Sequence, residues 1–143
     1  MATALQIEPT PTPDLPAVVR LNGMLLDSTA YVKGEWQGEE IPELIAQTDT
    51  LYTGDIVEGG GIAESITFIT TLGELDLAVT QATLYNEDYI EIHLVDGVVV
   101  RYATRRDPVQ TAYTIQEMYS IFSIEGDVPH ILDVRFQKPT VIN

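Results

Sequence analysis

The chain of 143 residues, 45% of them hydrophobic, is long enough to bury one core but short for two, which predicts a single globular domain with a short appendage. Its 22 acidic and 7 basic residues give a formal net charge of -15, which disfavours binding to nucleic acid or to anionic membrane surfaces. The chain has no cysteine, which excludes disulfides and thiolate metal sites.

The first 16 residues are expected to form a linker. The segment 8–16, EPTPTPDLP, carries four prolines, which remove backbone donors and favour an extended conformation. No run approaches the roughly 20 apolar residues of a membrane span. We therefore divide the chain into a Pro/Thr-rich linker or leader, 1–16, and one domain, 17–143.

The domain is predicted to begin with a hairpin. Ala17 to Leu21 and Met24 to Leu26 flank Asn22-Gly23, a dipeptide that readily takes the positive φ values of a tight turn. The following stretch, 31–47, contains Pro42, which lacks the N–H that a strand ladder needs. We therefore expect 31–47 to be an ordered loop.

A helix is predicted after Gly59-Gly60-Gly61. Apolar residues then recur at helical spacing and mark one buried face. They are Ile62, Ile66, Ile69, Leu72 and Leu75. Glycines before a helix can cradle an anion, but no Gly-Lys-Ser/Thr follows, so phosphate binding is disfavoured.

Strands and a second helix are predicted in the last part of the chain. After a strand over 78–85, residues 89–95 alternate apolar and polar, and Asp96-Gly97 then predicts a hairpin that returns over 98–103. Asp107 and Pro108 are typical of a helix start, and Gly126 is placed to end that helix. Its buried stripe is expected to be Ala112, Ile115, Tyr119 and Phe122.

The closing strand is predicted over 130–136 and could lie at a sheet edge. Leu132, Val134 and Phe136 are expected to face the core, and Asp133 and Arg135 to form a charge pair in a wet or interfacial setting. Together these elements predict an α+β fold, a twisted antiparallel β-sheet with two packed helices.

The sequence shows no recognisable catalytic or metal-binding motif. His93 and His130 are the only histidines, and neither sits in a nucleophile motif. His130 and Asp133 lack a third ligand at familiar spacing. No Asp-x-Asp-x-Asp-Gly loop is present for calcium. We therefore predict no catalytic, metal-binding or cofactor-binding residues and no enzymatic activity.

From Ala17 onward the chain resembles the extracytoplasmic β domain of the bacterial cell-division protein FtsQ, called DivIB in Gram-positive bacteria. The resemblance is carried by the hairpin, the IPELIA loop, the glycine-entered helix and the run YIEIHLVDGVVVRYATRRDPVQTAYTIQEMYSIFSIEG. Its most specific element is ILDVRF, 131–136, which is similar to the hydrophobic-Asp-hydrophobic-Arg-aromatic strand of that family. The resemblance covers 17–143.

The resemblance implies a non-enzymatic scaffold of the division complex on the extracytoplasmic side of the cell membrane, with a membrane anchor in the full-length protein. Its implied partners are FtsB/DivIC-like and FtsL-like proteins, one of which adds a strand to the last strand of the domain. Arg135 would pair with a partner carboxylate and Phe136 would make an apolar contact. The receiving edge would be Lys138, Pro139, Thr140, Val141 and Ile142.

Two questions stay open on the sequence. Pro139 lacks a donor, so it would either interrupt pairing with the partner or block unwanted edge pairing. A ligand-binding domain for a cell-wall glycan or peptide is the alternative function. Its stacking surface would be made of Trp36, Tyr52 and Tyr85.

Overall fold

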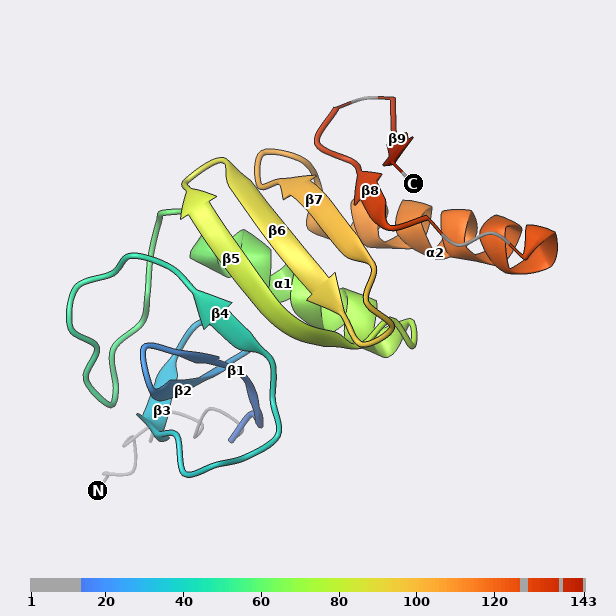
Figure 1. Cartoon of the computed structure of the whole chain (residues 1–143). Helices are drawn as coiled ribbons and strands as arrows, with labels where there is room; N and C mark the ends of the chain where they lie inside the picture. The colour runs from blue at the N-terminus through green and yellow to red at the C-terminus, as the bar shows by residue number, and fades with distance from the viewer. Residues whose placement is uncertain (1–13, 127–128, 137, 143) are drawn as a thin grey trace, which may run out of the picture.

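The computed structural model describes residues 14–126, 129–136 and 138–142. This part of the chain forms one nine-stranded sheet with two helices and confirms the α+β fold class (Figure 1). The strands are β1 (Ala17–Leu21), β2 (Met24–Asp27), β3 (Val32–Glu35), β4 (Glu43–Ile45), β5 (Val79–Asn86), β6 (Tyr89–Leu94), β7 (Val99–Ala103), β8 (Ile131–Asp133) and β9 (Thr140–Ile142). The helices are α1 (Ile62–Glu74) and α2 (Pro108–Glu125).

The sheet is mostly antiparallel. Its strand order is β3-β2-β1-β4-β5-β6-β7-β8-β9. The strand β4 is parallel to both β1 and β5, and β7 is parallel to β8. The last two of these parallel pairs are each joined through a helix, because a chain can return in the same direction only by a crossover. The prediction of antiparallel pairing is therefore correct for the hairpins, whereas the pairs β4/β5 and β7/β8 are parallel.

The prediction of a loop over 31–47 was wrong, because β3 and β4 form there. Pro42 comes immediately before β4, so the N–H that it lacks is not needed within that strand. Its carbonyl oxygen instead accepts a hydrogen bond from the backbone N–H of Arg20, at 2.9 Å. Leu44, in the middle of β4, is 1% exposed and belongs to the core. The short strand β4 thus joins the N-terminal hairpin to the rest of the sheet.

Local signals predicted the turns and helix ends correctly. Asn22 and Gly23 take φ values of 51° and 79° at the turn between β1 and β2. Asp107 accepts a hydrogen bond from the backbone N–H of Gln110 at 2.9 Å and caps α2. A Cβ at Gly61, before α1, would lie 2.7 Å from the carbonyl oxygen of Glu87, so only glycine fits there.

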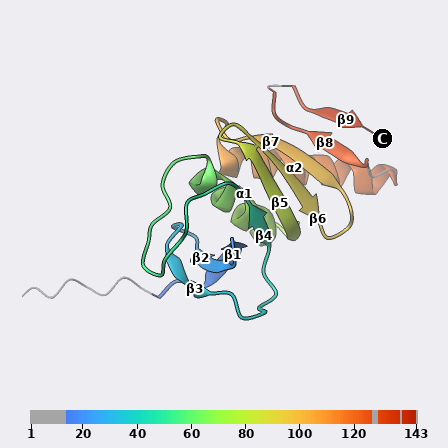
Figure 2. The ribbon, with the colours of Figure 1, turned by 60° about the vertical axis from the view of Figure 1, so that its left-hand side comes forward.

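Both helices lie on one face of the sheet, and the core fills the layer between the helices and the sheet (Figures 1 and 2). Alternate residues of β6, Ile90, Ile92 and Leu94, point into this layer as predicted. Phe68 of α1 stacks on Tyr102 of β7 with ring centroids 4.1 Å apart. Among the described residues, no helix lies on the opposite face of the sheet.

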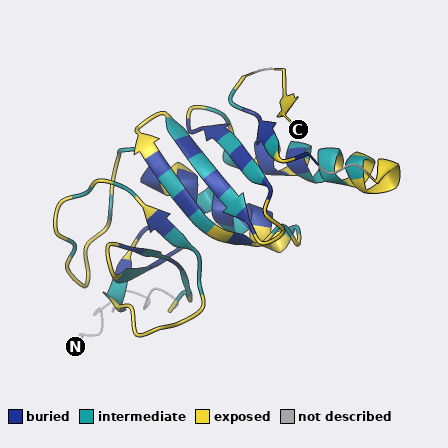
Figure 3. Cartoon of the chain, in the orientation of Figure 1, coloured by how far each residue is buried: buried dark blue, intermediate teal, exposed yellow. Residues whose placement is uncertain are grey.

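The far half of α2 is less buried than predicted. Ala112 and Ile115 are fully buried, but Tyr119 and Phe122 are only partly buried. Figure 3 shows the reason, since the second half of α2 extends beyond the strands and has an exposed end. Ile124, near that end, is 87% exposed.

Candidate partner-binding edge

The two edge strands of the sheet differ in how far other described segments cover them. At one end, the outer side of β3 is covered by the loop between β4 and α1. The backbone N–H of Val32 donates to the carbonyl oxygen of Asp55 at 2.8 Å, and the N–H of Gly54 donates to the carbonyl oxygen of Val32 at 2.8 Å. An isolated bridge also joins Tyr31 and Ile56. These bonds occupy backbone groups that an edge strand would otherwise leave open.

At the other end, β9 pairs with β8 alone among the described strands (Figure 2). In an antiparallel pair, alternate backbone groups point toward the neighbouring strand and the others point away from it. No other described strand therefore pairs with the outward N–H and C=O groups of β9, and a further strand could pair with them. The strand predicted over 130–136 corresponds to β8, which lies between β7 and β9, so its predicted position at the edge was wrong, and the edge is formed by β9.

The side chains of β9 are exposed. Thr140 and Ile142 pair with Asp133 and Ile131, so they point to the helix-free face, whereas Val141 pairs with Leu132 and points to the helix side. Val141 is 38% and Ile142 is 39% exposed, and neither belongs to the core.

Phe136, Lys138 and Pro139 lie in the connection between β8 and β9, outside both strands, and all three are exposed. Phe136, predicted to face the core, is 54% exposed, so that prediction was wrong. The reason is that β8 ends at Asp133, and the alternation of a strand does not continue through the bend that follows. Because Pro139 precedes β9, its missing N–H does not interrupt the pairing of β9 with β8.

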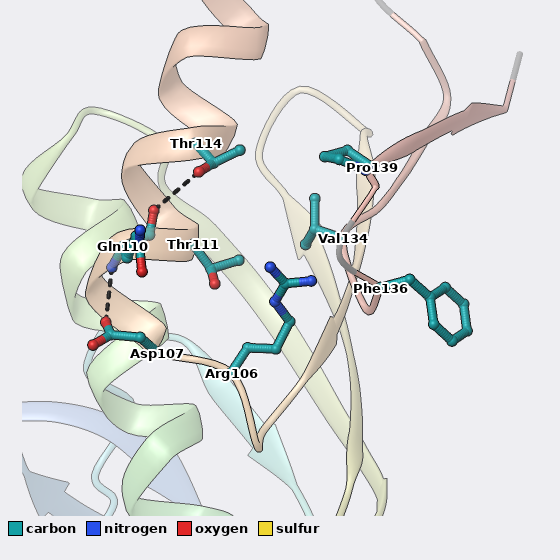
Figure 4. Close-up of a pocket in the computed structure, with 8 residues that line it drawn as sticks. All are labelled: Arg106, Asp107, Gln110, Thr111, Thr114, Val134, Phe136 and Pro139. Carbon is teal, nitrogen blue, oxygen red and sulfur yellow. Dashed lines mark hydrogen bonds between the residues drawn. The ribbon is translucent and has the colours of Figure 1, made fainter.

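A pocket of about 230 Å³ lies between α2 and the segment that connects β8 to β9 (Figure 4). It is lined by Arg106, Asp107, Gln110, Thr111, Thr114, Val134, Phe136 and Pro139. The side chain of Arg106 extends between the helix and Val134, while the ring of Phe136 points away from the helix, toward solvent. The pocket thus combines the guanidinium of Arg106 and the carboxylate of Asp107 with amide, hydroxyl and apolar groups next to the open edge.

Arg106 is a candidate site residue that sequence reasoning missed. Its backbone is held in place, because the hydroxyl of Tyr102 donates to its carbonyl oxygen at 2.5 Å and its N–H donates to the carbonyl oxygen of Ala103 at 3.0 Å. In the described part of the chain, its guanidinium has no hydrogen bond or ion pair. The sequence signal was the pair Arg105-Arg106 immediately before the helix cap, in a chain with few basic residues.

Arg135 has a carboxylate partner within the chain. Its Nε and Nη2 atoms donate to the two carboxylate oxygens of Asp133 at 2.9 and 2.7 Å. The guanidinium also lies over the rings of Tyr89 and Phe136, at 4.9 and 5.2 Å from their centroids. Pairing of Arg135 with a carboxylate of another protein stays a prediction, and it would have to share or replace this bidentate contact.

Asp133 is buried, contrary to the prediction of a wet setting for this charge pair. It is 6% exposed because β8 lies between β7 and β9 and because Arg135 covers the carboxylate. Burial by itself would raise the pKa of this carboxyl, but hydrogen bonds from Arg135 and the charges of Arg135 and Arg101 outweigh it and lower the pKa below its usual value of 3.8.

The charge of the chain is divided unequally around this edge. Residues 1–98 carry 17 acidic and two basic residues, whereas residues 99–143 carry five of each. The five basic residues of the second part are Arg101, Arg105, Arg106, Arg135 and Lys138. The β8–β9 end of the sheet is therefore the least negative region of a strongly acidic molecule, and it repels an acidic partner least.

The side chains proposed for ligand stacking belong to separate elements. Trp36 follows β3 and donates from its indole N–H to the carbonyl oxygen of Glu39 at 2.9 Å, Tyr52 lies in the loop before α1, and Tyr85 is on β5. Tyr85 stacks on Tyr89, with ring centroids 5.1 Å apart. In the described ranges no ring contact joins the three, and none of them lines the pocket beside α2.

The described residues contain no group of three or more His, Cys, Asp or Glu side chains that could hold a metal ion. His93 lies 3.6 Å from Glu91 on the helix-free face, and His130 is exposed. Neither α1 nor α2 is long and apolar enough to cross a lipid bilayer. Comparison with protein-family models and with curated proteins finds no match for this chain.

Proposed function

We propose that this chain is a non-enzymatic scaffold of the bacterial division complex that binds a small coiled-coil division protein of the FtsB/DivIC or FtsL type. The partner contributes a strand that pairs with β9 and extends the sheet. The domain would act on the extracytoplasmic side of the cell membrane, in a full-length protein that is membrane-anchored. The resemblance of ILDVRF to the division family supplies the identity of the partners.

The open edge at β9 is the observation that carries this proposal. An exposed edge strand can pair with strands of other molecules, and most folds cover such strands. Here the chain covers β3 with a loop but leaves β9 without an outer neighbour among the described residues. Strand addition draws its affinity from main-chain hydrogen bonds, and pockets beside the edge add specificity. Such an edge next to a pocket matches this mode of recognition.

The pocket beside α2 suggests what the partner presents. Arg106 offers a guanidinium without an ion pair among the described residues, and Phe136, which is 54% exposed, offers apolar surface. A partner segment with an acidic residue on one side of its strand and an apolar residue nearby would engage both. An ion pair that forms as the partner covers Arg106 would add to orientation and specificity more than to affinity.

Removal of β9 tests the proposal. We would compare the intact chain with a version that ends at Phe136, using surface-immobilised peptides of FtsB, DivIC and FtsL type. The truncated version should lose capture while it keeps its fold, because β9 adds no side chain to the core.

A matched control changes exposed apolar residues elsewhere. Replacement of Ile121 and Ile124, which are 54% and 87% exposed near the end of α2, by serine should leave capture unchanged. If the intact and truncated versions bind equally well, the edge is not the docking site. If the serine variant loses binding as well, the capture reflects general stickiness instead of strand addition.

A further inference from the structure

We propose that β9 opens independently of the rest of the sheet, and that Asp133 is the positioning residue that sets the closed geometry of this edge by holding Arg135. Three observations carry the proposal. They are the absence of β9 side chains from the core, the firm anchoring of β8, and the bidentate contact that spans the bend after β8.

The strand β9 is held by few interactions. All three of its side chains are exposed, and none is among those that form or line the core. In the described range 138–142 no side chain makes a hydrogen bond or an ion pair with another residue, and β9 has β8 as its one described neighbour. A short strand without buried apolar contacts opens at much lower free energy than the global unfolding of a domain.

The strand β8 is anchored in the core. Leu132 is fully buried and Val134, just after the strand, is 2% exposed. The backbone N–H of Val134 also donates to the carbonyl oxygen of Arg101 on β7 at 2.8 Å. Opening of β9 therefore pivots in the connection after Val134 and leaves the eight other strands in place.

Asp133 stabilises the bend that follows β8 by accepting hydrogen bonds from Arg135. In addition to the two side-chain bonds from Arg135, it accepts a hydrogen bond from the backbone N–H of Arg135 at 3.2 Å. Arg101 lies 4.0 Å from the same carboxylate on the other side, and Arg105 donates to the carbonyl oxygen of Arg135 at 3.5 Å. Without the carboxylate, Arg135 would lose its bidentate partner, and the negative charge between Arg135 and Arg101 would be reduced.

Loss of this contact would release the turn that leads to β9. Arg135 would no longer be held over Tyr89, and Phe136 would change its direction with it. If the proposed function is correct, a partner can pair only with the closed edge. Its apparent affinity is then reduced by the fraction of molecules that are open. Asp133 thus affects partner binding through Arg135, without contacting the partner.

Residue-resolved amide hydrogen exchange of the full chain tests the proposal without any partner. In the native protein, the slowest-exchanging amide of β9 should exchange at least roughly tenfold faster than the slowest amide of β7. Asp133→Asn should accelerate the β9 amide by a further several-fold and leave β7 unchanged. Asp133→Glu, which keeps the carboxylate, should restore part of the protection.

Glu91→Gln is the matched control. Glu91 is the other carboxylate beside Arg101, at 3.6 Å, and it accepts a hydrogen bond from Tyr89, but no hydrogen bond or ion pair joins it to Arg135 among the described residues. This variant should change β9 exchange much less than Asp133→Asn. If Asp133→Asn fails to fold, Arg135→Gln removes the same contact from a side chain that is 30% exposed, and it should accelerate β9 in the same way.

Two results would overturn the proposal. Equal protection of β9 and β7 would show that the edge unfolds only with the whole sheet. Acceleration of β9 by Glu91→Gln equal to that by Asp133→Asn would show that Asp133 has no special role. A partner peptide that leaves β9 exchange unaltered would count against the proposed function and would leave this inference intact.

Discussion

Phe136→Ala should weaken partner binding without weakening the fold. The ring is 54% exposed, lies beside the open edge and lines the pocket next to α2. A phenylalanine side chain buries roughly 150–250 Å² when fully covered. Its exposed part then corresponds to roughly 80–140 Å², worth about 2–3.5 kcal/mol at about 25 cal/mol per Å² if the partner covers it completely. We expect a loss of about 1–3 kcal/mol, or roughly 5- to 150-fold in Kd.

The assay for this prediction is a fluorescence titration with a labelled peptide of the FtsB or DivIC type. The unfolding free energy would be measured in parallel by urea titration. Because Phe136 lies outside the core, the unfolding free energy should change by less than about 0.5 kcal/mol. Tyr52→Ala provides a control of similar exposure, 67%, in the loop before α1 at the opposite end of the sheet, and it should leave Kd unchanged.

An unchanged Kd for Phe136→Ala, with the fold intact, would refute the assignment of this ring to the interface. A fall of several kcal/mol in the unfolding free energy would refute the reasoning at an earlier step. It would mean that the ring packs internally despite its exposure. The two measurements separate these outcomes because one reports the complex and the other reports the free domain.

Three further predictions concern the elements around the edge. Asp107→Ala removes the cap of α2 and should cost about 1 kcal/mol of unfolding free energy, and an unchanged urea midpoint would contradict this. Tyr102→Phe keeps the buried ring but removes the hydroxyl that binds the carbonyl oxygen of Arg106. It should cost about 1 kcal/mol and weaken peptide binding modestly, whereas an effect on stability alone would separate Arg106 from recognition. The pKa of Asp133 in the folded protein lies below its usual value of 3.8. The contact with Arg135 therefore stabilises the fold fully at pH values above 3.8, and this stabilisation is lost as the pH falls below 3.8 and through the folded-state pKa. The urea midpoints of the native protein and Asp133→Asn should therefore differ most near neutral pH and converge in acid, and a gap that stays constant to low pH would argue against this contact.

Several parts of the edge could be predicted from sequence because they depend on neighbouring residues. Asp107 and Gly126 bound α2 as expected, since capping involves residues within one turn of the helix. The closing strand could be predicted near 131–133, but not that β9 pairs with it and takes the edge, because this pairing forms only in the assembled sheet. Arg106 could not be assigned, because its role depends on Val134 and Pro139, which reach the same pocket from a distant part of the chain.

The amino-acid sequence by itself determined the turn at Asn22-Gly23, the two helices and the alternation along β6, because these features follow from φ preferences and from the spacing of apolar residues a few positions apart. The tertiary structure alone decided that β4 joins β1 to β5, that a loop covers β3, and that Asp133 is buried beneath Arg135. Each of these depends on hydrogen bonds, ion pairs or packing that form only once the sheet has assembled. Local sequence patterns therefore do not predict these contacts or their free energies.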